Sequence, residues 1–132
     1  MRPRIDLRLM LVAGPGDCRD RNLLDVVASA VRGGATTVQL RHKDAATRTL
    51  LEEARALKAL LDPLGVPLLI NDRADVARAV GAAGVHVGQA DLPPRDARRI
   101  LGPDALIGLT VKTLDQVREA ESLDVDYLGV GP

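Results

Sequence analysis

Aromatic residues are almost absent from this sequence of 132 residues, which contains one Tyr and neither Phe nor Trp. Apolar residues still make up 46% of the chain, so any hydrophobic core is expected to consist of Leu, Val, Ile and Ala. The length is that of one domain and is sufficient to bury such a core. We therefore interpret residues 1–132 as a single domain.

Cysteine is also scarce, and neither positive nor negative charge is in excess. Cys18 is the only cysteine, which excludes a disulfide within this sequence and a multi-cysteine metal site. Eighteen basic residues balance eighteen acidic ones, which argues against a basic nucleic-acid-binding surface. Nucleic acid is therefore not an expected partner.

No apolar run approaches the roughly 20 residues that a membrane span requires. The short apolar patch near the N-terminus is interrupted by Asp6 and Arg8 and lacks a convincing signal-peptide cleavage site. It is better interpreted as a first strand. We accordingly expect a cytoplasmic protein that does not associate with a membrane.

Short runs of aliphatic and β-branched residues recur along the chain. They occupy residues 7–13, 36–41, 67–72, 84–88, 106–111 and 127–132. The segments between them have helical spacing or helix-end signals, such as Pro93-Pro94 before a helix and the capping-box spacing of Thr113 and Gln116. Strands that alternate with helices indicate right-handed βαβ crossovers and a parallel sheet covered by helices.

This pattern leaves two arrangements of the sheet open. A doubly wound, flavodoxin-like sheet is compatible with 132 residues without anything missing. A complete (β/α)₈ barrel is not, because it typically needs about 250 residues. Length alone therefore favours the doubly wound alternative.

Polar side chains gather where the predicted strands end. In the stretch TTVQLRHKD, Gln39, Arg41 and Lys43 occupy alternate positions, which share one face of an extended chain. The later strands end in a similar set of polar residues, namely Asn71, Asp72, His86, Gln89, Asp91, Thr110 and Lys112. Because the carboxyl ends of parallel strands face the same way, these side chains are expected to converge on one rim.

The residue types at this rim suit a magnesium–diphosphate group. The planar fork of Arg41 and the point charge of Lys43 suit phosphate oxygens, and Asp72 and Asp91 are hard oxygen ligands of the kind that Mg²⁺ uses. Structural interpretations stay open for each residue taken singly. Either aspartate could cap the helix that follows it, and His86 could be a core histidine.

The motifs VQLRHKD, LLINDRADVA, GVHVGQADLPPRDARRILG, IGLTVKT and DYLGVGP, in this order, resemble the thiamine-phosphate synthase family. The resemblance implies a (β/α)₈ barrel, of which about six strands of eight would be present here. It also implies a transferase of thiamine biosynthesis. That enzyme couples hydroxymethylpyrimidine diphosphate to hydroxyethylthiazole phosphate and releases pyrophosphate.

The resemblance further implies roles for the rim residues. Gln39 would contact the aminopyrimidine, and Arg41, Lys43 and Asn71 would hold the diphosphate. Thr110 stands where the family usually has a serine near the leaving group. Arg41, Lys43 and Thr110 would thus serve catalysis as well as binding.

The metal site is implied in the same way, with Asp72 and Asp91 as the ligands of Mg²⁺. A related thiazole tautomerase shares the barrel but generally lacks this pair of aspartates, so the synthase is favoured over it. A non-catalytic flavodoxin-like binding or regulatory domain is a further alternative. It would need acidic residues or a hydroxyl-rich loop directly after the first strand, and LVAGPGD offers only Asp17, well past that strand.

The sequence departs from the family after the motif GVGP. Family members continue with a threonine-rich loop that carries a pyrophosphate-binding lysine, then a helix and two strands, whereas this sequence ends at Pro132. The resemblance therefore predicts a shortened chain that keeps the pyrimidine–diphosphate half of the site without robust synthase activity. It also predicts unpaired edges on the first and sixth strands, through which the chain could associate with itself.

Overall fold

The computed structural model describes residues 2–131. Its sheet has six strands in the order β1-β2-β3-β4-β5-β6, and each strand is parallel to its neighbours. The strands are β1 (Met10–Ala13), β2 (Thr37–Leu40), β3 (Leu68–Asn71), β4 (Gly84–Val87), β5 (Leu106–Val111) and β6 (Tyr127–Val130). The helices are α1 (Leu23–Arg32), α2 (Thr47–Leu61), α3 (Ala74–Val80), α4 (Pro94–Leu101) and α5 (Leu114–Ala120), with 3-10 turns η1 (Pro15–Asp17) and η2 (Asp62–Leu64).

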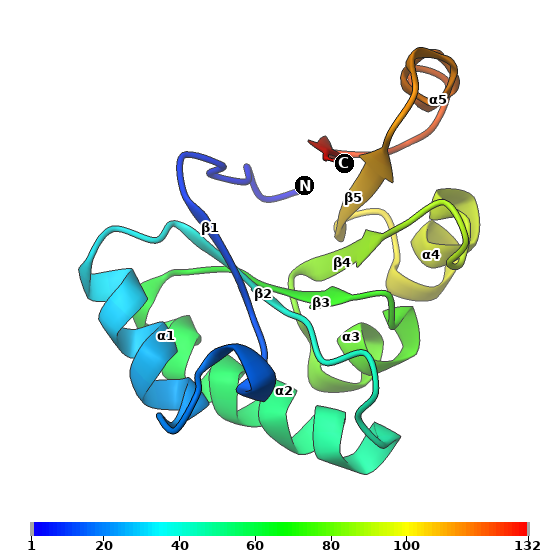
Figure 1. Cartoon of the computed structure of the whole chain (residues 1–132). Helices are drawn as coiled ribbons and strands as arrows, with labels where there is room; N and C mark the ends of the chain where they lie inside the picture. Colours follow the sequence, from blue (N-terminus) through cyan, green and yellow to red (C-terminus); the bar gives the residue numbers. More distant parts are fainter. Residues whose placement is uncertain (1, 132) are drawn as a thin grey trace.

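The order of the strands decides between the two predicted arrangements. A doubly wound sheet requires a point at which the strand order reverses, and the strands of residues 2–131 follow the order of the sequence without a reversal. The flavodoxin-like alternative is therefore wrong. The strands instead form a curled, half-barrel sheet with the helices around its outer side (Figure 1). Its edges within the described residues are β1 and β6, and self-association through them stays a prediction.

Each predicted strand is present, although most are shorter than their apolar runs. The second strand ends at Leu40, so Arg41 and Lys43 do not continue the extended face of Gln39 as the alternating pattern predicted. They lie in a turn between β2 and α2, and α2 consequently begins at Thr47 rather than near residue 44. The last residue of the predicted sixth strand, Pro132, lies outside the described residues.

The helices confirm the apolar stripes seen in the sequence. In α2, Leu50, Ala54, Leu57 and Leu61 are all buried, as their spacing predicts.

At α5 the capping box is only half formed. Thr113 accepts a hydrogen bond from the backbone N–H of Gln116 at 3.2 Å, but the Gln116 side chain accepts from the backbone of Lys112 instead of Thr113.

The core lies between the outer face of the sheet and the helices. Alternate strand residues supply it, for example Val38 and Leu40 of β2 and Val85 and Val87 of β4. The residue between the first two, Gln39, projects to the inner side of the curl, as expected from the period of two along a strand. Strand geometry thus places the apolar set under the helices and leaves the inner side for a different set of residues.

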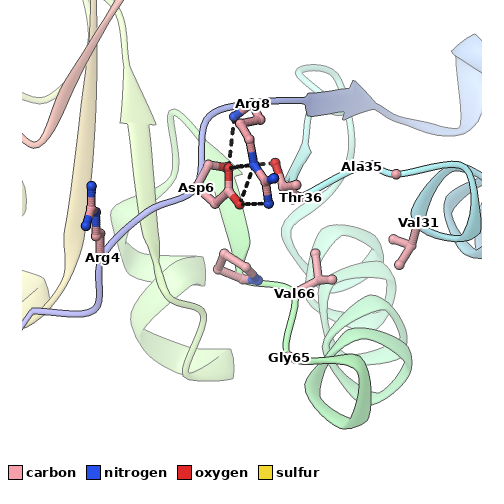
Figure 2. A pocket seen from close by; sticks show the side chains of 10 residues that line it. Arg4, Asp6, Arg8, Val31, Ala35, Thr36, Gly65 and Val66 are labelled. Atoms are coloured by element: carbon pink, nitrogen blue, oxygen red, sulfur yellow. Dashed lines mark hydrogen bonds and ion pairs between the residues drawn. The ribbon is translucent and has the colours of Figure 1, made fainter.

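The N-terminal segment runs past the amino ends of the strands. Arg2 forms an ion pair with Asp124 at 2.5 Å, just before β6. Further along, Asp6 and Arg8 pair with each other at 2.7 Å, and the Thr36 hydroxyl donates to the backbone oxygen of Asp6 at 2.9 Å (Figure 2). These contacts attach residues 2–9 to the amino end of the sheet. No helix among the described residues is both long and apolar enough to cross a membrane.

Candidate functional site

A cavity of about 690 Å³ lies at the carboxyl ends of the strands. All the rim residues predicted from the sequence line it: Gln39, Arg41, Lys43, Asn71, Asp72, His86, Gln89, Asp91, Thr110 and Lys112. They come from four successive strands and the turns after them, as the parallel topology predicts.

A second hollow of about 610 Å³ lies at the amino ends, beside Arg4, Asp6 and Arg8. Two of its charged groups, Asp6 and Arg8, neutralise each other, and Arg4 lies apart from them (Figure 2). The Asp6–Arg8 pair therefore contributes little net charge with which this hollow could bind a ligand. The carboxyl-end cavity is therefore the better candidate for a functional site.

The loop after β2 brings two cations to this cavity. Its start is held at Arg41, whose backbone N–H donates to Ala13 at 3.0 Å, and its middle at His42, whose Nδ1 lies 2.9 Å from the Glu53 carboxylate of α2. Gly14 allows the close approach of β1, because a Cβ there would lie 2.2 Å from the backbone oxygen of Arg41. The loop is thus attached on both sides, with the Arg41 and Lys43 side chains at the cavity.

Asp72 does not cap α3, contrary to one interpretation of the sequence. The N-cap residue is Arg73, and no side chain accepts a capping hydrogen bond there. Asp72 has a left-handed backbone, with φ of 65°, and its N–H donates to the backbone oxygen of His86 at 2.8 Å. A left-handed backbone is uncommon for a non-glycine residue. The Asp72 carboxylate lies 3.4 Å from Lys43 Nζ.

Asp91 does not cap α4 either, since the N-cap residue of that helix is Pro93. Its carboxylate instead accepts a hydrogen bond from the backbone N–H of Gly88 at 2.7 Å and closes the turn after β4. A Cβ on Gly88 would come within 3.0 Å of the same carboxylate oxygen. The turn therefore holds the Asp91 side chain at the cavity.

The two aspartates share a hydrogen bond, and their pKa values move apart. Burial, followed by the hydrogen bond and the charge of Asp91, raises the pKa of Asp72, while Lys43 opposes the shift. Burial would also raise the pKa of Asp91. The hydrogen bonds from Asp72 and Gly88 and the nearby charge of Lys43 outweigh it, so the pKa of Asp91 is lowered. Asp72 is therefore the member of the pair that takes up a proton more readily.

Asp72 and Asp91 are the two carboxylates that the sequence analysis predicted as metal ligands. No group of three or more His, Cys, Asp or Glu residues able to hold a metal ion occurs among residues 2–131. Two neighbouring carboxylates fit a hard divalent cation, which can displace a proton from either of them when it binds. Mg²⁺ in particular is commonly held by one or two carboxylates, with water and phosphate oxygens as its other ligands.

Thr110 belongs to a group of hydrogen-bonded side chains that sequence reasoning did not assemble. Its Oγ1 lies 2.7 Å from His86 Nε2, and the His86 Nδ1 lies 2.8 Å from the Tyr127 hydroxyl. Burial lowers the pKa of His86, with the charge of Asp91 in opposition. His86 is thus hydrogen-bonded, as the core interpretation expected, but it also lines the cavity.

Other cavity residues were missed or left without a role. Lys112 lines the cavity, as its place after the fifth strand predicted, but no role was assigned to it. Gln89 donates from its side chain to the backbone oxygen of Thr110 at 2.8 Å. Tyr127, the only aromatic residue apart from histidine, was recognised only as part of a strand. Its rarity in the composition was the one signal that could have singled it out.

Comparison with known proteins identifies the family of the chain. Residues 9–132 match the sequence model of the family described as "Thiamine monophosphate synthase". The chain is 56% identical over 127 residues to the thiamine-phosphate synthase of Xanthobacter autotrophicus, covering 96% of this chain and 60% of that protein. It is 54% identical over 132 residues to that of Solidesulfovibrio magneticus, covering 100% and 63%.

A solved structure gives the same result for the fold. The thiamine phosphate pyrophosphorylase from Pyrococcus furiosus superposes with a TM-score of 0.85 at 35% identity, covering 96% of this chain and 63% of that one. The chain thus spans about 60% of the length of the curated relatives it matches. Sequence and fold together show that this chain belongs to the thiamine monophosphate synthase family.

Proposed function

We propose that this chain carries the pyrimidine–diphosphate part of a thiamine-phosphate synthase, on six strands of what would be a (β/α)₈ barrel. The reaction couples hydroxymethylpyrimidine diphosphate to hydroxyethylthiazole phosphate and releases pyrophosphate. The observation that carries the proposal is the placement of Arg41 and Lys43 beside the Asp72–Asp91 pair around one cavity. Cations and paired carboxylates together suit a diphosphate that arrives with a divalent metal.

The polar groups divide into those for the heterocycle and those for the phosphates. Gln39 is nearly buried, with 4% exposed, and its amide is proposed to bond the edge of the aminopyrimidine. Arg41, Lys43 and Asn71 are proposed to hold diphosphate oxygens, for which a guanidinium and an ammonium are well suited. Thr110 is proposed to donate its hydroxyl to the leaving group.

Asp72 and Asp91 are proposed to hold Mg²⁺, which would offset the repulsion between the diphosphate and the acidic pair and stabilise the departing charge. The chain's own contribution to the bond-breaking step is charge neutralisation. When the carbon–oxygen bond breaks, its electron pair passes to the diphosphate, where Arg41 and Lys43 stabilise the added negative charge. The resulting pyrimidine-methyl cation is then captured by the thiazole nitrogen.

The direct test is calorimetric titration of the purified chain with hydroxymethylpyrimidine diphosphate, with and without Mg²⁺. Binding that depends on the metal is expected, because the carboxylate pair repels the ligand without it. A chain that melts cooperatively and yet binds no diphosphate in either condition would refute the proposed function.

Replacing Arg41 by Lys is expected to weaken diphosphate binding by roughly tenfold, since a hydrogen bond to a charged group contributes about 1.5–3 kcal/mol. Lysine keeps the charge but loses the planar fork that engages two oxygens at once. The measurement is the dissociation constant in Mg²⁺. Arg48→Lys, on the exposed start of α2, is the matched control, and equal constants for both variants would contradict the role of the fork.

A further inference from the structure

Three side chains from β4, β5 and β6 form a continuous hydrogen-bonded row at the cavity. The Tyr127 hydroxyl lies 2.8 Å from His86 Nδ1, and His86 Nε2 lies 2.7 Å from Thr110 Oγ1. The phenol and imidazole rings are 5.4 Å apart between centroids. Only the Thr110 end of this row is among the residues assigned a role above.

Glycines on the neighbouring strands leave space for this row. A Cβ at Gly108 would lie 2.2 Å from the Tyr127 ring and 2.5 Å from His86 Nδ1. A Cβ at Gly129 would lie 3.1 Å from His86 Cε1. These are the positions paired across the sheet with His86 and Thr110, respectively. Glycine at these two positions therefore makes room for the imidazole between the two hydroxyl groups.

The direction of the hydrogen bonds follows from the donors available. Among the described residues, the Tyr127 hydroxyl has His86 Nδ1 as its only hydrogen-bond partner. Nδ1 is thus the protein acceptor for the proton of this half-buried hydroxyl, and a donor shielded from water without an acceptor is costly. The single proton of a neutral imidazole then lies on Nε2. From there it is donated to Thr110 Oγ1, so that the threonine proton is free to point elsewhere.

We propose that His86 and Tyr127 are positioning residues that present the Thr110 hydroxyl as a hydrogen-bond donor to an oxyanion in the cavity. A diphosphate oxygen is the acceptor that the surrounding cations suit, and in this respect the inference rests on the proposed function. If the imidazole proton were on Nδ1, the threonine proton would instead turn to the unprotonated Nε2 of His86. Thr110 would then offer the ligand lone pairs, which repel an anion.

Two substitutions of His86 separate positioning from packing. His86→Gln places an amide N–H near the position of Nε2 and is expected to keep diphosphate affinity within about threefold. His86→Asn keeps a polar group near Nδ1 but does not reach Thr110. It is expected to lower the affinity roughly tenfold or more, the effect of losing a hydrogen bond to a charged group. Affinity is measured with inorganic pyrophosphate and Mg²⁺ on chains whose thermal melts remain cooperative.

A double-substitution cycle shows whether His86 acts through Thr110. Thr110→Val removes the hydroxyl at similar volume and is expected to lower pyrophosphate affinity to a similar extent. In that background His86→Asn should change the affinity by less than about twofold, because the group it positions is gone. Fold-changes that multiply in the double variant, or an equal loss for the Gln and Asn variants, would overturn the proposal.

The tautomer of His86 can be read without any ligand. Long-range proton–nitrogen correlation spectra of the ¹⁵N-histidine-labelled chain should show the proton on Nε2, with His86→Gln used to separate its signals from those of His42. Tyr127→Phe should shift the population towards the Nδ1–H form. A wild-type ring protonated on Nδ1 alone would overturn the inference. Failure of the wild-type chain to bind pyrophosphate would instead count against the proposed function, and the tautomer would then decide the inference by itself.

Discussion

Replacing Asp72 by Asn is expected to lower Mg²⁺-dependent diphosphate affinity roughly 100-fold or more, since losing even an outer-shell partner of a metal ligand costs 10–100-fold. The amide cannot supply the negative charge that a divalent cation requires. Its N–H can still donate to the Asp91 carboxylate, which interacts with Asp72 in the native pair. Binding in the absence of Mg²⁺ should not weaken, because the substitution removes a negative charge that repels the diphosphate.

The same substitution is expected to leave the fold intact. Asn tolerates the left-handed backbone of residue 72 about as well as Asp does, and no helix cap is lost. The matched control is Asp75→Asn, which removes a carboxylate paired with Arg73 on the exposed start of α3. Titrations of both variants with and without Mg²⁺ are compared. An Asp72 variant with unchanged magnesium dependence, or a loss shared equally by Asp75→Asn, would show that the carboxylate has another role.

Replacing Gly84 by Ala is expected to destabilise the chain by about 3 kcal/mol or more, at the upper end of the range for overpacking. The added Cβ would lie 1.9 Å from the backbone oxygen of Leu106 and 2.6 Å from its carbonyl carbon. These are backbone atoms of β5, hydrogen-bonded in register with β4. They cannot turn aside as a flexible side chain could, so the strands must separate.

Chemical denaturation measures this loss as a shift in the midpoint at constant slope. Gly16→Ala is the control, because no atom lies within 4 Å of a Cβ added there. That variant should unfold at or slightly above the wild-type midpoint. Similar midpoints for the two alanine variants would mean that β4 and β5 pack less closely than the structure shows.

The strands and the rim were predictable because both follow from local patterns. Apolar runs of β-branched residues gave the six strands, and the parallel topology implied by alternating helices gave the convergence of Gln39, Asn71 and Thr110 on one cavity. The curl of the sheet was not predictable from periodicity and length. Those favoured a doubly wound sheet, and only the resemblance to a family indicated otherwise.

Two features of the site lay outside what the sequence could indicate. The helix-cap interpretations of Asp72 and Asp91 were wrong because the chain turns one or two residues further on, which moves the caps to Arg73 and Pro93. The contact between His86 and Tyr127 joins residues 41 positions apart. It depends on the register of β4, β5 and β6, which no local pattern specifies.

The left-handed backbone of Asp72 also restricts how the position can evolve. Glycine, asparagine and aspartate are the residues that adopt this conformation most readily. Glutamate would keep the negative charge but is poorly suited to a φ of 65°. A single base change converts an aspartate codon into an asparagine codon. In gene copies released from selection, replacement of Asp72 by Asn is therefore better tolerated by the fold than replacement by Glu, and it removes the negative charge.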